Sequence, residues 1–126
     1  MELQVFNNAE FGSVRTTTVN GDVMFVGKDV ADILGYQNGS RDINRHVAVE
    51  NRLKTMIFDG NQNKETILIN ESGLYSLILS SKMPNARKFK HWVTAEVLPS
   101  IRKHGMYAMD EILENPDFVI AAFTKL

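Results

Sequence analysis

The chain has 126 residues, of which 44% are hydrophobic and 23% charged, and its formal net charge is -1 at pH 7. This length and apolar content suit one soluble globular domain with a single core, and they leave too few residues for a second full domain. The absence of cysteine excludes disulfides, thiolate zinc sites and cysteine nucleophiles, and the lack of both a signal peptide and an apolar run of roughly 20 residues predicts a cytoplasmic protein without a membrane helix.

Two β-hairpins are predicted in the first part of the chain. The runs LQVF, SVRTTTV and DVMFV are rich in β-branched or alternating apolar residues, and Asn20-Gly21 separates the last two. Both turn residues tolerate the positive φ of a type I′ turn, so this pair is a strong hairpin signal. The runs KTMIF and TILIN flank the polar loop DGNQNKE and predict the second hairpin.

Between the hairpins, KDVADILGYQNGSRDINRHV predicts two short helices joined by a tight turn. The apolar residues of the first helix end at Leu34, and Gly35 can take the left-handed stop position. Ser40 is predicted to cap the second helix, in which Ile43 and Val47 form the inner edge.

The second half of the chain is predicted to be helical. Asn70 caps the run ESGLYSLILSS, in which Gly73 indicates close packing, and Asn85 caps a helix through KFKHWVTAEV. This helix should kink or restart at Pro99, because proline cannot donate to the preceding turn. An Asn-Pro start signal then predicts a last helix, DFVIAAFTKL, which has no stop signal. We therefore expect the chain to be the N-terminal part of a longer protein.

The hairpins and helices together predict an α+β fold, in which small antiparallel β-hairpins pack with a helix-turn-helix-like pair and a C-terminal helical half. Ala31 and Gly35 supply the small residue and the turn residue that a helix-turn-helix needs. On the second helix, Arg41 and Arg45 lie opposite the inner edge and Asn44 lies at the flank. Arginine pairs bidentately with guanine and asparagine with adenine, so these side chains suit a DNA-recognition helix. The second hairpin would take the place of the wing in a winged helix.

Other polar and basic side chains could contact DNA phosphates. The candidate DNA-binding residues are Ser40, Arg41, Asn44, Arg45, His46, Arg52, Lys54, Arg87, Lys88 and Lys90. The last three belong to a basic segment that precedes an acidic one, so the small net charge hides a segregation. Exposed helix faces are often charged only because they are solvated, and Asp42 would repel phosphate. A helix pair that only packs is therefore the alternative interpretation.

Catalysis has little support in the sequence. His46 and Glu50 could ligate a metal from one helix face, but the chain has no HExxH motif, and the other two histidines are far along the chain. It also has no glycine-rich phosphate loop and no GxSxG elbow. We expect no enzyme, no metal and no cofactor.

Several strings resemble one known family. FVGKDVADILGYQN, INRHV, INESGLY, A-x-x-F-x-x-W and EVLPSIRK-x-G-x-Y resemble the BRO N-terminal domain of phage antirepressors and of baculovirus repeated proteins, over about residues 3 to 107. The resemblance implies a DNA-binding module, in the cytoplasm of a bacterial host, of a prophage protein that relieves repression by binding a phage repressor. Residues 1–107 would form this module, and residues 108–126 a linker and the start of a helix that leads to a further C-terminal region.

Two functional hypotheses follow. The first is a module that binds double-stranded DNA. The second is a module that binds a phage repressor protein without contacting DNA, with its hairpins extending a partner's sheet. Neither involves a membrane, and both leave a homo-oligomer open. In either case Tyr75, Phe89 and Trp92 are expected to lie in the core.

Overall fold

A computed structural model describes residues 3–103 of the chain. The predicted last helix and the boundary at residue 107 lie outside these residues. Two units are distinguished, up to Lys90 and from His91 onward. The first unit holds the strands β1 (Gln4–Asn8), β2 (Gly12–Val19), β3 (Asp22–Val26), β4 (Arg52–Phe58) and β5 (Asn63–Ile69), the helices α1 (Gly27–Ile33), α2 (Gly39–His46) and α3 (Glu71–Ser80), and the 3-10 turn η1 (Val49–Asn51). Helix α4 (Ala86–Trp92) begins in the first unit and leads into η2 (Val93–Val97) in the second.

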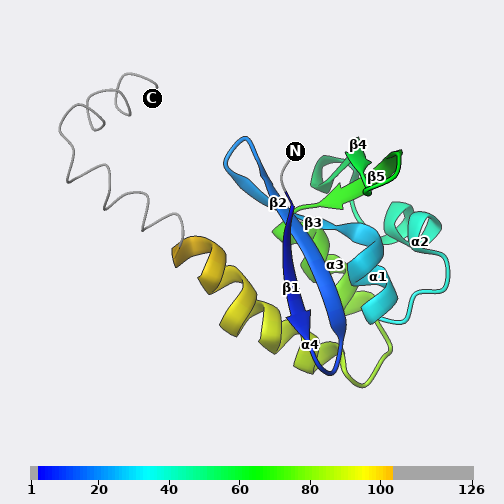
Figure 1. Ribbon diagram of the computed structural model, residues 1–126. Coiled ribbons are helices and arrows are strands. Elements are labelled where there is room, and N and C mark those ends of the chain that lie inside the picture. The colour runs from blue at the N-terminus through cyan, green and yellow to red at the C-terminus, as the bar shows by residue number, and fades with distance from the viewer. Residues whose placement is uncertain (1–2, 104–126) are drawn as a thin grey trace, which may run out of the picture. The chain divides into compact units, whose positions relative to one another are not determined.

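The strands form one five-stranded antiparallel sheet in the order β1-β2-β3-β5-β4 (Figure 1). The fold is therefore α+β as predicted, but the two hairpins are not separate. Phe25 of β3 lies opposite Ile69 of β5, and Val26 lies opposite Leu68. This short pairing joins the hairpins and leaves β1 and β4 as the edge strands.

Both predicted hairpin turns are present. Asn20 and Gly21 have φ angles of 51° and 86°, as a type I′ turn requires. The strands of the second hairpin extend into the predicted loop, which shortens it to 59–62. There the Asp59 carboxylate accepts hydrogen bonds from the backbone N–H groups of Gln62 and Asn61, both at 2.9 Å. These bonds lower the pKa of Asp59, and they brace the tip of the hairpin.

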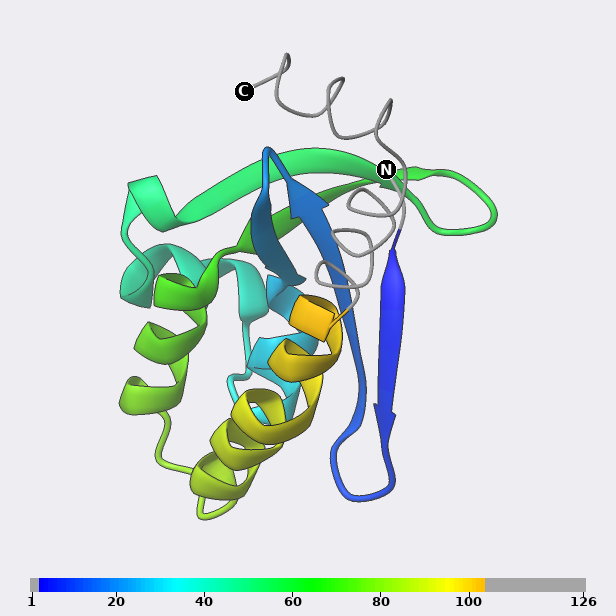
Figure 2. The ribbon, with the colours of Figure 1, turned by 90° about the vertical axis from the view of Figure 1, so that its left-hand side faces the viewer.

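The sheet has an apolar layer on each face. Phe25 and Ile69 are fully buried, as are Leu74 and Leu77 of α3, and Figure 2 shows α1 and α3 together on one side of the sheet. On the other side, a second cluster consists of Met24, Val26, Ile57 and Leu68, with Leu3 and Val19 packed against it. Because neighbouring residues of a strand point to opposite faces, β3 and β5 contribute to both layers.

The predicted helix starts are partly confirmed. Asn70 caps α3, since its side-chain oxygen accepts from the Gly73 N–H at 2.9 Å. The prediction that Ser40 caps α2 is wrong, because Asn38 is the cap and the helix already begins at Gly39. Helix α4 begins after Asn85 as predicted, but the Asn85 side-chain oxygen is buried without a hydrogen-bond partner among the described residues.

Close packing at Gly73 is confirmed. A Cβ atom at this position would lie 3.0 Å from both the Asn51 carbonyl oxygen and the Val47 Cγ1 atom, and 3.1 Å from the Ile69 Cβ atom. The glycine thus lets α3 approach the end of α2, η1 and the end of β5 closely. Of the three aromatic residues expected in the core, Phe89 and Trp92 are buried, whereas Tyr75 is only half-buried.

The second unit accommodates Pro99 without a restart of the helix. Residues Val93–Val97 form a π-helical turn, in which the Leu98 N–H donates to the carbonyl of Val93, and helical structure then continues to Lys103. A wider turn suits this place, because the proline ring would clash with the carbonyl four residues earlier in an ordinary α-helix. No helix of residues 3–103 is both long enough and apolar enough to cross a membrane.

Candidate nucleic-acid interface

The turn between α1 and α2 has the geometry that the sequence predicted. Gly35 has a φ angle of 83°, in the left-handed region that glycine tolerates best. Ala31 is fully buried, and a Cβ atom added at Gly39 would lie 3.8 Å from the Ala31 Cβ atom. The two small residues therefore allow the helices to approach each other closely.

A reciprocal pair of hydrogen bonds fixes the start of α2. The Asn38 side-chain oxygen accepts from the Arg41 N–H at 3.1 Å, and the Asp42 carboxylate accepts from the Asn38 N–H at 3.2 Å. This is a variant of the capping box, in which a side chain at each end satisfies a backbone donor at the other. Asp42 is buried in this arrangement. It does not lie on the exposed face of the helix, and its carboxylate lies 3.6 Å from the Arg41 Nε atom, so that the positive charge of Arg41 offsets the predicted repulsion of phosphate.

The exposed side of α2 carries the predicted recognition residues. Arg41, Asn44 and Arg45 are exposed, whereas Ile43 and Val47 are buried. The predicted division of the helix into an inner edge and an outer polar face is therefore confirmed.

His46 lies at the boundary between these two sides. Its ring is half-buried, with its centroid 5.5 Å from that of Tyr36. The Tyr36 hydroxyl donates to the Leu77 carbonyl at 2.8 Å, and burial raises the pKa of Tyr36. The His46 ring is thus part of the packing that holds the α1–α2 turn against α3.

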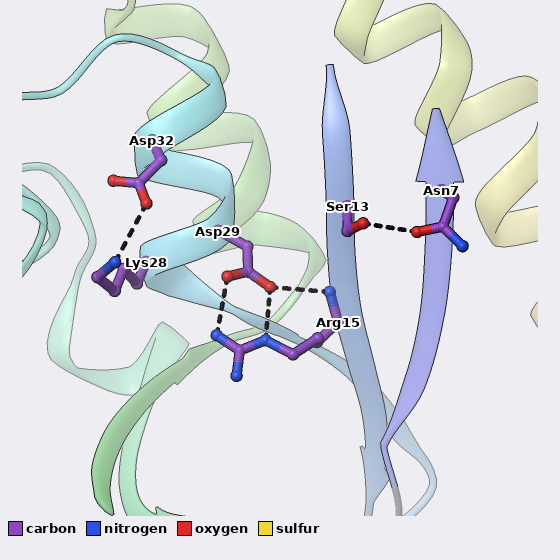
Figure 3. A network of polar contacts seen from close by, with 6 residues as sticks. All are labelled: Asn7, Ser13, Arg15, Lys28, Asp29 and Asp32. Carbon is purple, nitrogen blue, oxygen red and sulfur yellow. Dashed lines mark hydrogen bonds and ion pairs between the residues drawn. The ribbon is translucent and has the colours of Figure 1, made fainter. Parts of the chain in front are cut away.

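An ion pair that the sequence analysis missed fastens α1 to the sheet (Figure 3). The Arg15 Nε atom lies 2.8 Å from one Asp29 oxygen, and Arg15 Nη2 donates to the other oxygen at 2.9 Å. The Arg15 backbone N–H also donates to Asp29, at 3.0 Å. The hydrogen bond to Asp29 raises the pKa of Arg15. No local signal could have revealed this pair, because the residues lie on a strand and a helix far apart in sequence.

A groove of about 710 Å³ lies between the β4–β5 hairpin and the two helices. Its lining includes Ser40 and Asn44 of α2 and Lys54 of β4. The other cations that line it are Arg15, Lys28 and Lys64, and the acids are Asp32, Asp59 and Glu65. Most of these charges are already paired, since Lys28 lies 3.3 Å from Asp32 and Lys54 lies 3.4 Å from Glu65. The groove is therefore polar, but its charge is nearly balanced.

The remaining candidate residues are dispersed. Arg52 donates to the Val47 carbonyl at 3.4 Å, where it caps the end of α2. Arg87, Lys88 and Lys90 are exposed on α4, and Lys88 lies 3.5 Å from Glu10. In Figure 1 the beginning of α4 lies apart from α2, beyond α1 and α3. The structure thus gathers Ser40, Asn44 and Lys54 at the groove beside Arg41 and Arg45, and it leaves the three α4 cations elsewhere.

Residues 3–103 offer no group of three or more His, Cys, Asp or Glu residues that could hold a metal ion.

The fold and the site define a small α+β module that presents an arginine-bearing helix beside a β-hairpin. The family model described as "BRO family, N-terminal domain" matches residues 13–99 of this sequence. The chain belongs to this family.

Relatives occur in a bacterium and in several viruses. An uncharacterized protein of Haemophilus influenzae is 39% identical over 89 residues, which cover 71% of this chain and 44% of the relative. A Bro-N domain-containing protein of Invertebrate iridescent virus 6 is 34% identical over 132 residues, covering 79% of this chain and 32% of the relative. A Bro-N domain-containing protein of Acanthamoeba polyphaga mimivirus is 37% identical over 102 residues, covering 70% and 40%. The chain thus spans less than half the length of these relatives. No solved structure matches.

Proposed function

We propose that this chain is the DNA-binding N-terminal module of a phage antirepressor that regulates the lysogenic/lytic switch. The observation that carries the proposal is the exposure of Arg41, Asn44 and Arg45 on one side of α2. The other side of the helix is buried, and hydrogen bonds between Asn38, Arg41 and Asp42 fix the start of the helix. The three exposed side chains therefore project from a well-anchored helix.

In this proposal α2 enters the major groove of a DNA duplex. The groove admits one α-helix, and its base edges offer guanine acceptors to Arg41 and Arg45 and adenine to Asn44. The β4–β5 hairpin lies next to α2, and its Lys54 and Lys64 line the protein's own groove between the hairpin and the helices. These lysines would contact the phosphate backbone after exchanging their present acidic neighbours for phosphate.

The test is a titration of the protein into labelled double-stranded DNA from its own control region, followed by fluorescence anisotropy. The double variant Arg41→Ala/Arg45→Ala should bind at least about thirtyfold more weakly, because each lost bidentate contact costs about 1–3 kcal/mol. Lys82→Ala/Lys103→Ala removes the same charge from exposed positions that are not candidate contacts, and it should change the affinity little. Equal affinity of both double variants, with the fold intact by circular dichroism, would refute the recognition-helix assignment.

A module that binds a repressor protein without DNA is the second candidate. The near balance of charge in the groove favours it, since Lys28 and Lys54 already have acidic partners. In that case the immobilised protein should retain the cognate repressor at physiological salt, while duplex DNA gives no saturable signal. Saturable DNA binding without retention of the repressor would argue against this candidate.

A further inference from the structure

Strand β4 leaves one edge of the sheet open. Among the described residues it pairs only with β5. Figure 2 shows the β4–β5 hairpin as a long ribbon whose loop projects away from α1 and α3. The outer N–H and C=O groups of β4 are thus available for pairing with another strand.

The side chains of this strand are unusual for a solvent-facing edge. Leu53, Met56 and Phe58 are 41%, 56% and 62% exposed. Natural edge strands are usually protected by charges, bulges or prolines. Here Arg52 and Lys54 supply charges, but three large apolar side chains on the same seven-residue strand remain in contact with water. An edge of this kind is stabilised when another strand covers it.

The order of residues in β4 is complementary to itself. We consider two antiparallel β4 strands related by a two-fold axis at Thr55. The residues brought opposite each other are Thr55 with Thr55, Lys54 with Met56, Leu53 with Ile57, and Arg52 with Phe58. Apolar residues meet apolar residues or lysine and arginine stems, the guanidinium can stack on the aromatic ring, and no two like charges stand directly opposite each other.

We propose that β4 is the dimerisation strand of this protein and that its partner is the β4 strand of a second copy, paired antiparallel about Thr55. Such an interface uses the same patch on both subunits, as a closed two-fold dimer requires. It joins two five-stranded sheets into one continuous sheet. Because only one strand per subunit takes part, the contact area is small and the dimer should form in the micromolar range.

The dimer would have a consequence for DNA recognition, and this consequence rests on the proposed function. Helix α2 precedes β4 directly in the chain, with only η1 between them. A two-fold axis at Thr55 would therefore place two α2 helices symmetrically, as a reader of a palindromic site does.

Sedimentation velocity of the full chain without DNA tests the dimer itself. Met56→Lys places a lysine opposite Lys54 of the other subunit at two symmetric positions and should weaken dimerisation about tenfold. Within the chain Met56 lies opposite Glu65, so the new lysine has an acidic neighbour and the fold should persist. Leu79→Lys makes the same change at an exposed position on α3 and should leave the dimer intact. Adding Lys54→Glu to Met56→Lys should restore dimerisation, because each opposed pair then carries opposite charges.

Disulfide trapping tests the register. The chain contains no cysteine, so a single introduced thiol gives an unambiguous cross-link. Thr55→Cys should form a covalent dimer under mild oxidation, because directly opposed residues lie within the distance that a disulfide spans. Val5→Cys on the other edge strand, β1, should remain monomeric. A wild-type chain that stays monomeric into the millimolar range, or equal cross-linking at both positions, would overturn the proposal. Neither result depends on DNA binding.

Discussion

Individual side chains in this domain act mainly by holding the helix pair in place. The bidentate contact between Arg15 and Asp29 ties the first turn of α1 to β2 (Figure 3). The Tyr36 hydroxyl and the Ser81 hydroxyl each donate to a backbone carbonyl across the α1–α3 boundary, at 2.8 and 2.9 Å. Arg15 also lines the groove of the candidate interface, and together these contacts determine where that interface lies.

Loss of the Arg15–Asp29 contact should destabilise the domain. Asp29→Asn weakens three hydrogen bonds to a carboxylate whose side chain is 14% exposed, and about 1–2 kcal/mol of unfolding free energy should be lost. Asp32→Asn is the matched control, because Asp32 is 58% exposed and pairs with the exposed Lys28. Its cost should stay below about 0.5 kcal/mol. Urea unfolding measures both changes, and equal effects would contradict the structural role of Asp29.

Alkaline pH should destabilise the domain through Tyr36. Burial, together with the nearby charge of Asp42, raises the pKa of this phenol above its ordinary value of 10.0. The unfolded chain therefore ionises first as pH rises, so the stabilisation is complete below pH 10.0 and is lost as pH rises through the folded pKa. Chemical unfolding across this range should show a steeper loss for the wild type than for Tyr36→Phe. Parallel curves would show that Tyr36 makes no such contribution.

At the scale of elements, short helices depend on their ends and on close approach. Helix α2 has eight residues, a length at which an isolated helix is marginal in water. Its stability therefore comes from the Asn38 cap and from burial of Ile43. Helix α3 is more apolar, and its approach to the end of α2, η1 and β5 depends on the missing side chain at Gly73.

The identity of the α2 cap can be tested directly. Asn38→Ala removes the acceptor of the Arg41 N–H and should cost about 1 kcal/mol of unfolding free energy. Ser40→Ala, which would be equally costly if Ser40 were the cap, should change stability by less than about 0.5 kcal/mol. Thermal or urea denaturation separates the two variants, and the reverse order would restore Ser40 as the cap.

Two glycine variants should have opposite effects. Gly73→Ala places a Cβ atom 3.0 Å from the Asn51 carbonyl oxygen, and the resulting strain should outweigh the gain in helix propensity and cost about 1–3 kcal/mol. Gly39→Ala meets only ordinary contacts, the nearest at 3.8 Å. It should be neutral or stabilise the domain by up to about 1 kcal/mol. Comparison of the urea midpoints decides this, and a stabilised Gly73→Ala would disprove the close packing.

At the scale of the whole molecule, charge limits how strongly DNA can be bound. The net charge is -1, and the cations are spread over α2, the hairpin and α4. The proposed DNA binding would therefore depend on a few local contacts, and nonspecific attraction should be weak. The common two-fold axis of the proposed dimer would double the number of these contacts.

The salt dependence of DNA binding should reveal the number of phosphate contacts. The logarithm of the affinity should fall by about 0.9 per contacted phosphate for each tenfold rise in salt. Replacing both Lys54 and Lys64 by Ala should reduce this slope by about two units, since each lysine lines the groove beside α2. The same anisotropy titration at several salt concentrations measures the slope. An unchanged slope would place the phosphate contacts elsewhere.

Much of this structure depends on local signals that the sequence carries openly. The Asn20-Gly21 turn, the stop at Gly35, the cap at Asn70 and the inner edge of α2 follow from backbone preferences and from the period of apolar residues. The Bro-N motifs likewise identified the family from the residues alone. The Asn38 cap was missed because several neighbouring polar residues offer similar side chains and local preference does not choose among them.

Only the tertiary structure decided how these elements combine. The pairing of β3 with β5 joins two hairpins into one sheet, the Arg15–Asp29 contact bridges a strand and a helix, and the groove forms between segments far apart in the chain. The tertiary structure likewise decided that the beginning of α4, with its cations, lies apart from α2. The physical reason is that long-range contacts are selected by the packing of the whole core. No residue pattern within a single element specifies which distant partner will satisfy it.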